Sequence, residues 1–261
     1  MLYFRMLLGL IVAWLFYATS LIAQTHHAWS YNLGMYEVNL RNYSEEGNFA
    51  AFQADLDRID SLGSGILWFM PVHPIGEFNR LGSLGSPYSV QDYYAVNPDY
   101  GELSDFKVLV QEIHDRGMYV IIDWVANHTA WDHVLTESNP EWYVKDLAGN
   151  FISPPGTNWS DVIELDYQKQ GLRDYMIQAL SFWVDSVGVD GFRFDAVDFV
   201  PDDFWREATA ALVETKPDIL LLAEGPGEEL IDLGFHMNYS WAYYGFGGGI
   251  LSQITQGVAD A

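Results

Sequence analysis

Short apolar segments alternate with segments of helical periodicity along this chain, and the alternation limits the folds available to it. Apolar runs predict strands over 33–43, 65–72, 118–127, within 188–199, and over 218–225, with a further candidate over 233–241. Helical spacing predicts helices over 49–63, 104–117, 171–188 and 201–217, and one starting near residue 248. Ser104 is the expected N-cap of the second helix and Gly117 its terminator. Apolar strands joined by helices indicate a parallel sheet covered on both faces.

The predicted strand within 188–199 holds two charged residues, Arg193 and Asp195. Residues i and i+2 of a strand point to the same face, so the two side chains are expected to lie together. Burying such a pair is costly. We interpret Asp195 as a catalytic carboxylate that Arg193 keeps ionised, with a structural ion pair as the alternative. Because the strand over 218–225 ends near a second acid, Glu224, the pattern favours a paired-carboxylate hydrolase on an α/β barrel.

A closed barrel of this kind has eight strands, and about six are predicted here. Either the chain is a fragment or the fold is not a closed barrel. The expected fold class is α/β, a (β/α)8 TIM-type barrel that is incomplete at the C-terminus. Residues 129–170 are rich in Asn, Pro, Trp and Asp and are long for a βα connection. We expect them to form an inserted subdomain after the third strand, within a catalytic barrel domain spanning residues 24–261.

The charge balance limits the partners of this chain. It has 36 acidic and 12 basic residues, a formal net charge of −24. Nucleic acid is disfavoured because its phosphates require Lys and Arg, and an anionic membrane surface is disfavoured for the same reason. A neutral ligand such as a sugar fits better, and the 16% aromatic content is compatible with sugar binding. The chain has no cysteine, which excludes disulfides and thiol chemistry.

The first residues are typical of a secretory signal. Arg5 precedes the apolar run MLLGLIVAWLF, and small residues near Ala23 offer cleavage positions. We expect a signal peptide over 1–23, export to the periplasm or the exterior, and no stable membrane association after cleavage. The alternative is an uncleaved membrane anchor, which the shortness of the apolar run disfavours.

Four motifs in order resemble the α-amylase family of glycoside hydrolases, which are (β/α)8 enzymes acting on α-glucans. They are SPYSVQDYY (86–94), DWVANH (123–128), GFRFDA (191–196) and LLAEG (221–225). The resemblance implies that Asp195 is the nucleophile and that Glu224 is the general acid/base. It also implies that Arg193 holds Asp195 ionised. Asn127 and His128 would follow the third strand, with His128 binding the sugar beside the scissile bond and Tyr88 stacking under that sugar.

Two departures from the family pattern affect the expected activity. No segment after Gly225 resembles the Asn-His-Asp motif that holds the family's third carboxylate, so residues 1–261 alone are expected to have little or no activity. Phe199 occupies the position, four residues after the nucleophile, where many relatives have a calcium-binding histidine. Asn127 is a possible oxygen ligand, but we expect no required cofactor and regard structural Ca²⁺ as doubtful.

The resemblance implies a retaining hydrolase of α-1,4-glucosidic bonds in starch, maltodextrins or related α-glucans. The alternatives are an α-glucan transglycosylase and a non-catalytic amylase-like binding protein. Retention of Asp195 and Glu224 argues against a binding-only role. Four tryptophans are candidates for lining a sugar cleft, although core packing is the preferred explanation for each of them: Trp124, Trp131, Trp142 and Trp159.

Overall fold

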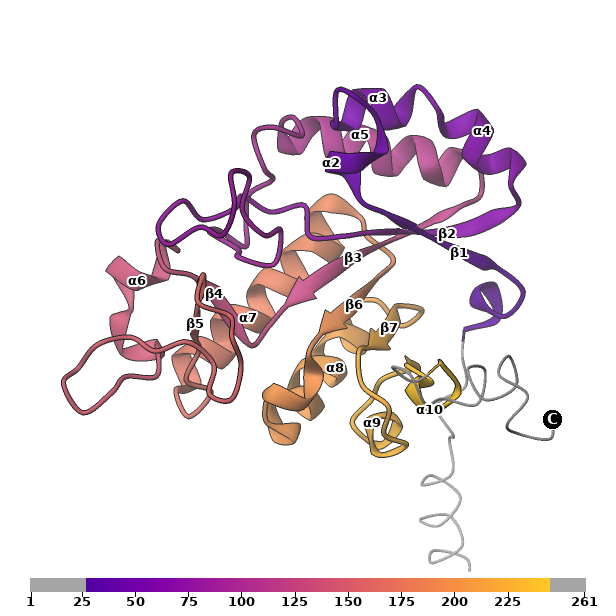
Figure 1. Ribbon diagram of the computed structural model, residues 1–261. Coiled ribbons are helices and arrows are strands. Elements are labelled where there is room, and N and C mark those ends of the chain that lie inside the picture. Colours follow the sequence, from indigo (N-terminus) through magenta and orange to yellow (C-terminus); the bar gives the residue numbers. More distant parts are fainter. Residues whose placement is uncertain (1–26, 245–261) are drawn as a thin grey trace, which may run out of the picture.

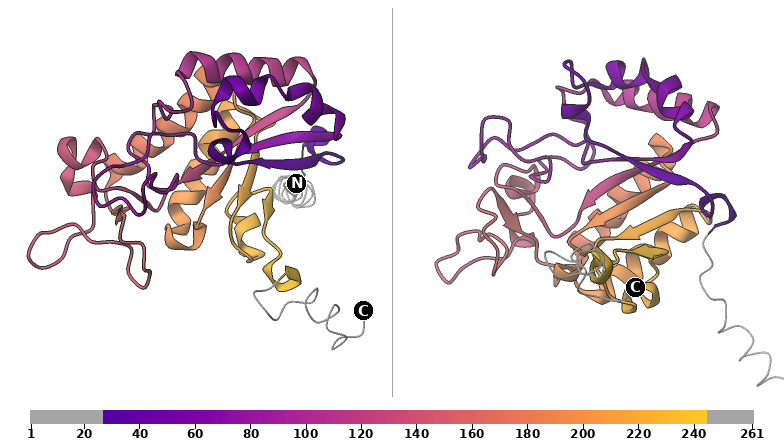
Figure 2. Two further views of the ribbon diagram at one scale, coloured as in Figure 1. Left: turned by 45° about the horizontal axis from the view of Figure 1, so that its top comes forward. Right: turned by 45° about the vertical axis from the view of Figure 1, so that its right-hand side comes forward.

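The computed structural model describes residues 27–244, and six strands in this range form one sheet (Figure 1). They are β1 (Gly34–Val38), β2 (Ser64–Phe69), β3 (Tyr119–Val125), β6 (Gly191–Asp195), β7 (Leu220–Ala223) and β8 (Met237–Asn238). Their spatial order is β1-β2-β3-β6-β7-β8, and every neighbouring pair is parallel. Figure 2 shows the sheet as a curved, open arc. This is the arrangement of six consecutive strands of a (β/α)8 barrel.

Helices connect the strands, as parallel pairing requires. The longer ones are α5 (Leu103–Asp115), α7 (Gln170–Phe182) and α8 (Asp202–Thr215). The shorter ones are α2 (Leu40–Tyr43), α3 (Phe49–Gln53), α4 (Leu56–Ser61) and α9 (Glu229–Asp232), and a further short helix, α10 (Trp241–Tyr244), follows β8. The predicted strands and helices of residues 27–244 are thus present in the expected order.

Several predicted boundaries are wrong. The strand expected over 33–43 ends at Val38. Leu40, which is buried in the core at 4% exposure, is the first residue of the helix α2. The helix expected over 49–63 is two short helices, α3 and α4. Ser104 is not the N-cap of α5. Glu102 holds that position, and its side chain and that of Asp105 each accept a backbone N–H of the other residue.

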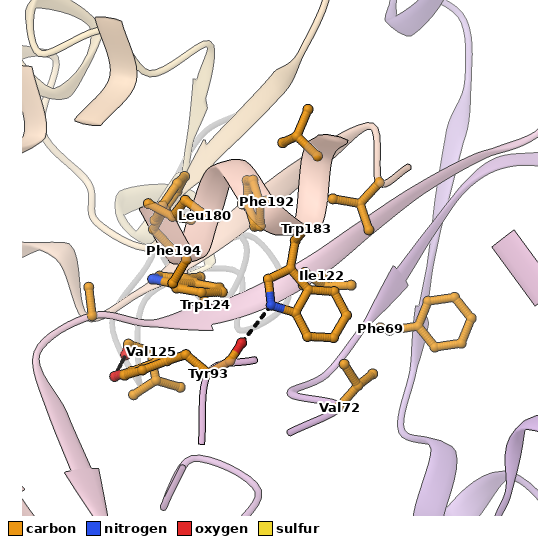
Figure 3. Close-up of a cluster of buried hydrophobic side chains, with 14 of the residues drawn as sticks. Phe69, Val72, Tyr93, Ile122, Trp124, Val125, Leu180, Trp183, Phe192 and Phe194 are labelled. Carbon is orange, nitrogen blue, oxygen red and sulfur yellow. Dashed lines mark hydrogen bonds between the residues drawn. The ribbon is translucent and has the colours of Figure 1, made fainter. Parts of the chain in front are cut away.

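The helix expected over 171–188 also changes its geometry before it ends. α7 stops at Phe182, and residues Trp183–Val187 form a π-helical turn that Gly188 terminates at φ +91°. Trp183 in this turn is fully buried and donates from Nε1 to the Tyr93 carbonyl oxygen at 2.7 Å (Figure 3). The Tyr93 hydroxyl donates in turn to the Val125 carbonyl oxygen at 2.6 Å, which ties the loop after β2 to the end of β3.

The two faces of the sheet differ in chemistry, as the two-residue period of a strand allows. One face packs with the helices in the main core, to which β3 contributes Ile122 and Trp124. The opposite, inner face has a small apolar cluster of Ile66, Ile121 and Leu220 near the N-terminal ends of the strands. The charged residues Asp123 of β3 and Arg193 and Asp195 of β6 lie further along the same face. The inner face is therefore apolar at one end and polar at the other.

Residues 128–170 form a separate layer of structure beside the barrel strands (Figure 1). The layer contains β4 (His128–Ala130) paired antiparallel with β5 (Val162–Glu164), the helix α6 (Leu135–Ser138) and the 3₁₀ turn η2 (Pro140–Trp142). It is joined to the loop after β2, since the Ala130 N–H donates to the Val90 carbonyl oxygen at 2.8 Å. The expected inserted segment thus has secondary structure of its own.

None of the helices within 27–244 is long and apolar enough to cross a lipid bilayer. The predicted signal peptide over 1–23 and the helix expected near residue 248 lie outside the described residues.

A buried histidine in the main core predicts sensitivity to acid. His73 is 0% exposed, and neither of its ring nitrogens has a hydrogen-bond partner in the structure. Burial lowers its pKa from 6.5 to about 3, so the folded protein keeps it neutral while the unfolded chain takes up a proton below pH 6.5. The free energy of unfolding should therefore fall by about 1.4 kcal/mol per pH unit for this residue between pH 6.5 and 3.

His73→Phe keeps a ring among Tyr93, Trp124 and Trp183, whose ring centroids lie 5.1–5.9 Å from the imidazole. We expect the variant to lose about 2 kcal/mol less than the wild type on acidification from pH 7 to pH 5. Urea denaturation at both pH values measures the difference. If the free energy of unfolding fell equally in the two proteins, the lowered pKa of His73 would be contradicted.

Candidate active site

The two predicted catalytic acids lie at the same edge of the sheet on adjacent strands. Asp195 is the last residue of β6, and Glu224 directly follows β7. The Glu224 N–H donates to the Phe194 carbonyl oxygen at 2.9 Å, which continues the ladder to this edge. At the start of β6, only glycine leaves room for the neighbouring strand β7, because a Cβ atom on Gly191 would lie 2.0 Å from the Leu220 carbonyl oxygen. Asp195 and Glu224 therefore lie at the C-terminal edge of the sheet, where barrel enzymes place their active sites.

One guanidinium binds both acids. Arg193 Nη1 lies 3.0 Å from Asp195 Oδ1, and Nη2 lies 2.8 Å from Glu224 Oε2. The Arg193 side chain is only 5% exposed, whereas Asp195 and Glu224 are 13% and 25% exposed. The arginine is therefore buried beneath two carboxylates that solvent can reach. The expected pairing of Arg193 with Asp195 on one face of the strand is confirmed.

A third carboxylate, Asp123 on β3, belongs to the same cluster and was not assigned a role from the sequence. Its Oδ1 lies 2.7 Å from Arg193 Nη1, and its side chain is 0% exposed. β3 pairs with β6 so that Asp123 is opposite Arg193 and Val125 is opposite Asp195. The sequence did hold a sign of this role, because a charged aspartate inside the apolar run YVIIDWV is as unusual as the charged residues of β6.

The pKa values of two of the three acids, Asp195 and Asp123, are raised, because both acids are buried and the cluster has only one arginine. Burial, reinforced by the charge of Asp123, raises the pKa of Asp195 from 3.8 to about 7, although Arg193 opposes the change. Burial likewise raises the pKa of Asp123 to about 6, again against the effect of Arg193. Arg193 does lower the pKa of Asp195, as expected of a group that keeps this acid ionised, but desolvation is the larger effect and the net pKa is raised.

The turn after Asp195 holds Glu224 in place. Ala196 has φ +46°, a left-handed conformation that is uncommon outside glycine. Its N–H donates to Glu224 Oε2 at 2.9 Å. The same Glu224 oxygen thus accepts the backbone N–H of the residue after β6 and also contacts the Arg193 guanidinium. This arrangement orients the carboxyl group relative to Asp195 before any substrate is bound.

Two aromatic residues not singled out from the sequence enclose the guanidinium. Arg193 lies over the rings of Trp68 and Tyr239, at 5.4 and 5.6 Å from their centroids. Its Nε also donates to the Tyr239 hydroxyl at 3.2 Å. Neither ring has a local sequence signal, because each is brought to the arginine by a different strand or loop.

The remaining predicted site residues lie around this cluster. The Tyr88 hydroxyl donates to Asp123 Oδ2 at 3.1 Å, which ties the loop after β2 to the acids. Asn127 and His128 follow β3 and are both buried, with Asn127 Nδ2 lying 3.2 Å from His128 Nδ1. Burial lowers the pKa of His128 to about 4, so the imidazole is neutral at pH 7. Their roles toward a sugar stay predictions.

Asn127 and Phe199, the two positions considered for calcium, have other contacts in the structure. The Asn127 amide is hydrogen-bonded to His128, and the Phe199 ring packs on Trp159 at 5.4 Å between centroids. Within 27–244, no three His, Asp or Glu side chains gather in a way that could hold a metal ion. Calcium independence stays a prediction, which thermal unfolding with and without EDTA tests.

Two acids at the C-terminal edge of neighbouring barrel strands are typical of barrel glycosidases. The family described as "Alpha amylase, catalytic domain" matches residues 39–162 and 156–230, more than half of the chain. The chain therefore belongs to the α-amylase family. The crystal structure of an α-amylase from Lactobacillus plantarum is 42% identical with a TM-score of 0.79, covering 87% of this chain and 56% of that one. These similarities confirm the expected fold class, an incomplete (β/α)8 barrel.

Curated relatives include proteins of two activities. Alpha-amylase 3 of Dictyoglomus thermophilum is 27% identical over 75% of this chain and 44% of its own length. Alpha-1,4-glucan:maltose-1-phosphate maltosyltransferase of Mycolicibacterium smegmatis is 31% identical over 75% of this chain and 31% of its own length. The chain thus spans less than half the length of either relative.

Proposed function

We propose that this chain contains the catalytic acids of a retaining glycosidase that cleaves α-1,4-glucosidic bonds in maltodextrins, starch or related α-glucans. The observation that supports the proposal is the placement of Asp195 and Glu224 on adjacent strands, both bound to the buried guanidinium of Arg193. A paired-carboxylate mechanism requires two acids within reach of one glycosidic bond. The net charge of −24 also suits a neutral substrate.

In the proposed mechanism, an Asp195 carboxylate oxygen attacks the anomeric carbon and forms a covalent glycosyl-enzyme. The bond from that carbon to the leaving oxygen breaks as Glu224 donates its proton to this oxygen. Glu224, now ionised, then takes a proton from a water molecule, whose oxygen attacks the anomeric carbon and releases Asp195. Arg193 and the Ala196 N–H orient the two acids, and Asp123 orients Arg193 and Tyr88.

A second candidate is an α-glucan transglycosylase, and the similarity to maltosyltransferases is the observation that favours it. The same covalent intermediate serves both reactions, with a sugar hydroxyl replacing water in the second step. Incubating the complete gene product with maltoheptaose and separating the products by chromatography distinguishes them. Shorter sugars alone indicate hydrolysis, and products longer than the substrate indicate transfer. Binding without any turnover would instead favour a non-catalytic amylase-like protein.

The raised pKa of Asp195 predicts the pH dependence of the reaction. The nucleophile reacts in its ionised form, and its pKa is about 7 in the free protein. We expect kcat/KM to fall by up to about tenfold for each pH unit below pH 7, while the need for a protonated Glu224 limits the rate at higher pH. Initial rates across pH 4 to 8 measure this limb. A plateau that continues down to pH 5 would show that Arg193 outweighs burial at this carboxyl.

We also propose that the protein is exported after removal of residues 1–23. The support is the sequence itself, in which Arg5 precedes an apolar run and Ala23 ends a segment with small residues. N-terminal sequencing of protein recovered outside the cytoplasm tests the cleavage position. Recovery in the membrane fraction with Met1 retained would favour the anchor instead.

A further inference from the structure

Tyr239, the residue that directly follows β8, is a partner of Arg193 that has no role in the proposed mechanism. Its hydroxyl accepts the Arg193 Nε–H at 3.2 Å. A guanidinium has five N–H donors, distributed over Nε, Nη1 and Nη2. The three carboxylates of the cluster bind instead at Nη1 or Nη2: Asp123, Asp195 and Glu224. Tyr239 is thus a neutral partner that binds the guanidinium at the end joined to the side chain.

The partners of Arg193 differ in whether they change charge during the proposed reaction. Asp195 is an anion before it attacks and part of a neutral ester in the glycosyl-enzyme, whereas Glu224 begins as a neutral acid and becomes an anion. Asp123 and Tyr239 form no bond to the substrate in this mechanism. Asp123 contacts Nη1 at 2.7 Å and Tyr239 contacts Nε at 3.2 Å, so these two partners hold the guanidinium at separate points throughout the reaction.

The backbone of Tyr239 is fixed by hydrogen bonds on the strand side and on the loop side. Its N–H donates to the Gly225 carbonyl oxygen at 2.9 Å, just beyond the last residue pair of β7 and β8. The preceding residue, Asn238, donates from Nδ2 to the Gly227 carbonyl oxygen at 2.7 Å. The fold therefore places the phenol hydroxyl beside Arg193 before a substrate binds, as a preorganised site requires.

Aromatic rings also contact the guanidinium, so the effect of the Tyr239 hydroxyl has to be separated from that of its ring. Arg193 lies 5.4 Å from the Trp68 ring centroid and 5.6 Å from that of Tyr239. Trp68 is on β2, and in the sheet β2 and β8 lie on either side of β3, β6 and β7, which carry the acids or lead into them. A cation–π contact needs only the ring, whereas the hydrogen bond at Nε needs the hydroxyl.

We propose that Tyr239 is a positioning residue, which holds Arg193 at Nε so that the guanidinium keeps its orientation while Asp195 and Glu224 react. The inference rests on the proposed function and adds a residue to it that acts through Arg193 without touching the reacting atoms. Without the hydroxyl, the guanidinium is less firmly oriented toward Asp195. The ionised form of this acid is then less stabilised, because a nearby positive charge favours it.

Tyr239→Phe in the complete gene product tests the proposal, because it removes the hydroxyl and keeps the ring over Arg193. With maltoheptaose, we expect kcat to fall about fivefold, a factor that one hydrogen bond commonly contributes, and KM to change by less than about twofold. We also expect the acid limb of kcat/KM to move upward by about half a pH unit, since ionised Asp195 is less favoured. Initial rates across pH 4 to 8 measure both effects.

Tyr243→Phe is the matched control. Tyr243 is 51% exposed in α10, and the same chemical change there should alter neither kcat nor the acid limb. Thermal unfolding of the three proteins measures any loss of stability. If Tyr239→Phe lowers kcat and leaves the acid limb unmoved, the residue only stabilises the fold, and the proposal is overturned. Wild-type kcat and an unmoved limb in Tyr239→Phe would also overturn it.

Failure of the proposed function gives a different result. If the wild type binds maltoheptaose without turnover, hydrolysis is refuted. The position of Arg193 can still be tested by NMR of the carboxyl carbons, in which Asp195→Asn identifies the Asp195 signal. A higher pKa of Asp195 in Tyr239→Phe than in the wild type supports the positioning of Arg193 by Tyr239, and an equal pKa overturns it.

Discussion

In the complete gene product, replacing Asp195 by asparagine is expected to lower kcat for maltoheptaose hydrolysis by at least about 10⁴-fold, because an amide cannot form the glycosyl-enzyme. The fold should be retained. The ionised carboxylate is disfavoured in the folded state, as the raised pKa shows, so the neutral amide removes a cost instead of adding one. Activity assays and thermal unfolding of the same preparations measure both effects.

Asp202→Asn is the matched control for this prediction. Asp202 is an exposed aspartate at the start of α8, seven positions after Asp195. The substitution makes the same chemical change outside the site, and we expect a change in kcat of less than about twofold. If Asp195→Asn retained wild-type kcat, the assignment of the nucleophile would be wrong.

Replacing Arg193 by glutamine is expected to lower the free energy of unfolding at pH 8 by about 3–5 kcal/mol, because it leaves buried carboxylates without their counter-charge. Asp123 is the most affected, since it is 0% exposed and lies 2.7 Å from the guanidinium. Activity should also be lost, because Asp195 and Glu224 lose the group that orients both of them. Urea denaturation and initial rates measure the two losses.

The loss of stability should depend on pH. Both Asp123 and Asp195 have pKa values raised by burial, so their protonation in the folded state becomes favourable as the pH falls. Removing the positive charge matters less once these acids are neutral. The difference between Arg193→Gln and the wild type should therefore shrink from pH 8 to pH 5. A difference that is constant over this range would indicate that Arg193 stabilises through packing rather than charge.

Arg193→Lys provides the comparison. Lysine retains the positive charge but lacks the planar fork with which Arg193 reaches Asp195 and Glu224 through different nitrogens. We expect most of the stability to be retained and most of the activity to be lost. Equal stability losses in the lysine and glutamine variants would show that geometry, not charge, stabilises the cluster.

Local sequence patterns were sufficient for the order of the elements and for part of the site. Apolar runs such as YVIIDWV predict buried strands, and the spacing of Arg193 and Asp195 predicts that both side chains share a face. Both features depend on the two-residue period of a strand. The boundaries were less predictable. Ser104 is a good capping residue by type, yet Glu102 caps α5 because Asp105 completes the reciprocal hydrogen bonds.

The acid cluster shows what sequence alone could not predict. Asp123 and Arg193 are 70 positions apart, and only the pairing of β3 with β6 places them opposite each other. The net pKa of Asp195 also depends on more than its neighbour in the strand. The partner Arg193 is visible in the sequence, whereas the burial that outweighs it is a property of the whole fold.

The sequence by itself determined the alternating parallel architecture, the family, and the two acids proposed to act on substrate, because these depend on periodicity and on short contiguous motifs. The tertiary structure alone decided that Asp123 joins the site, that one guanidinium links Asp195 to Glu224, and that Tyr239 lies against this guanidinium. These relations depend on strand register and on contacts between distant segments. The pKa values of the acids, and the set of side chains that one ligand can contact, depend on distances and burial that exist only once the chain has folded.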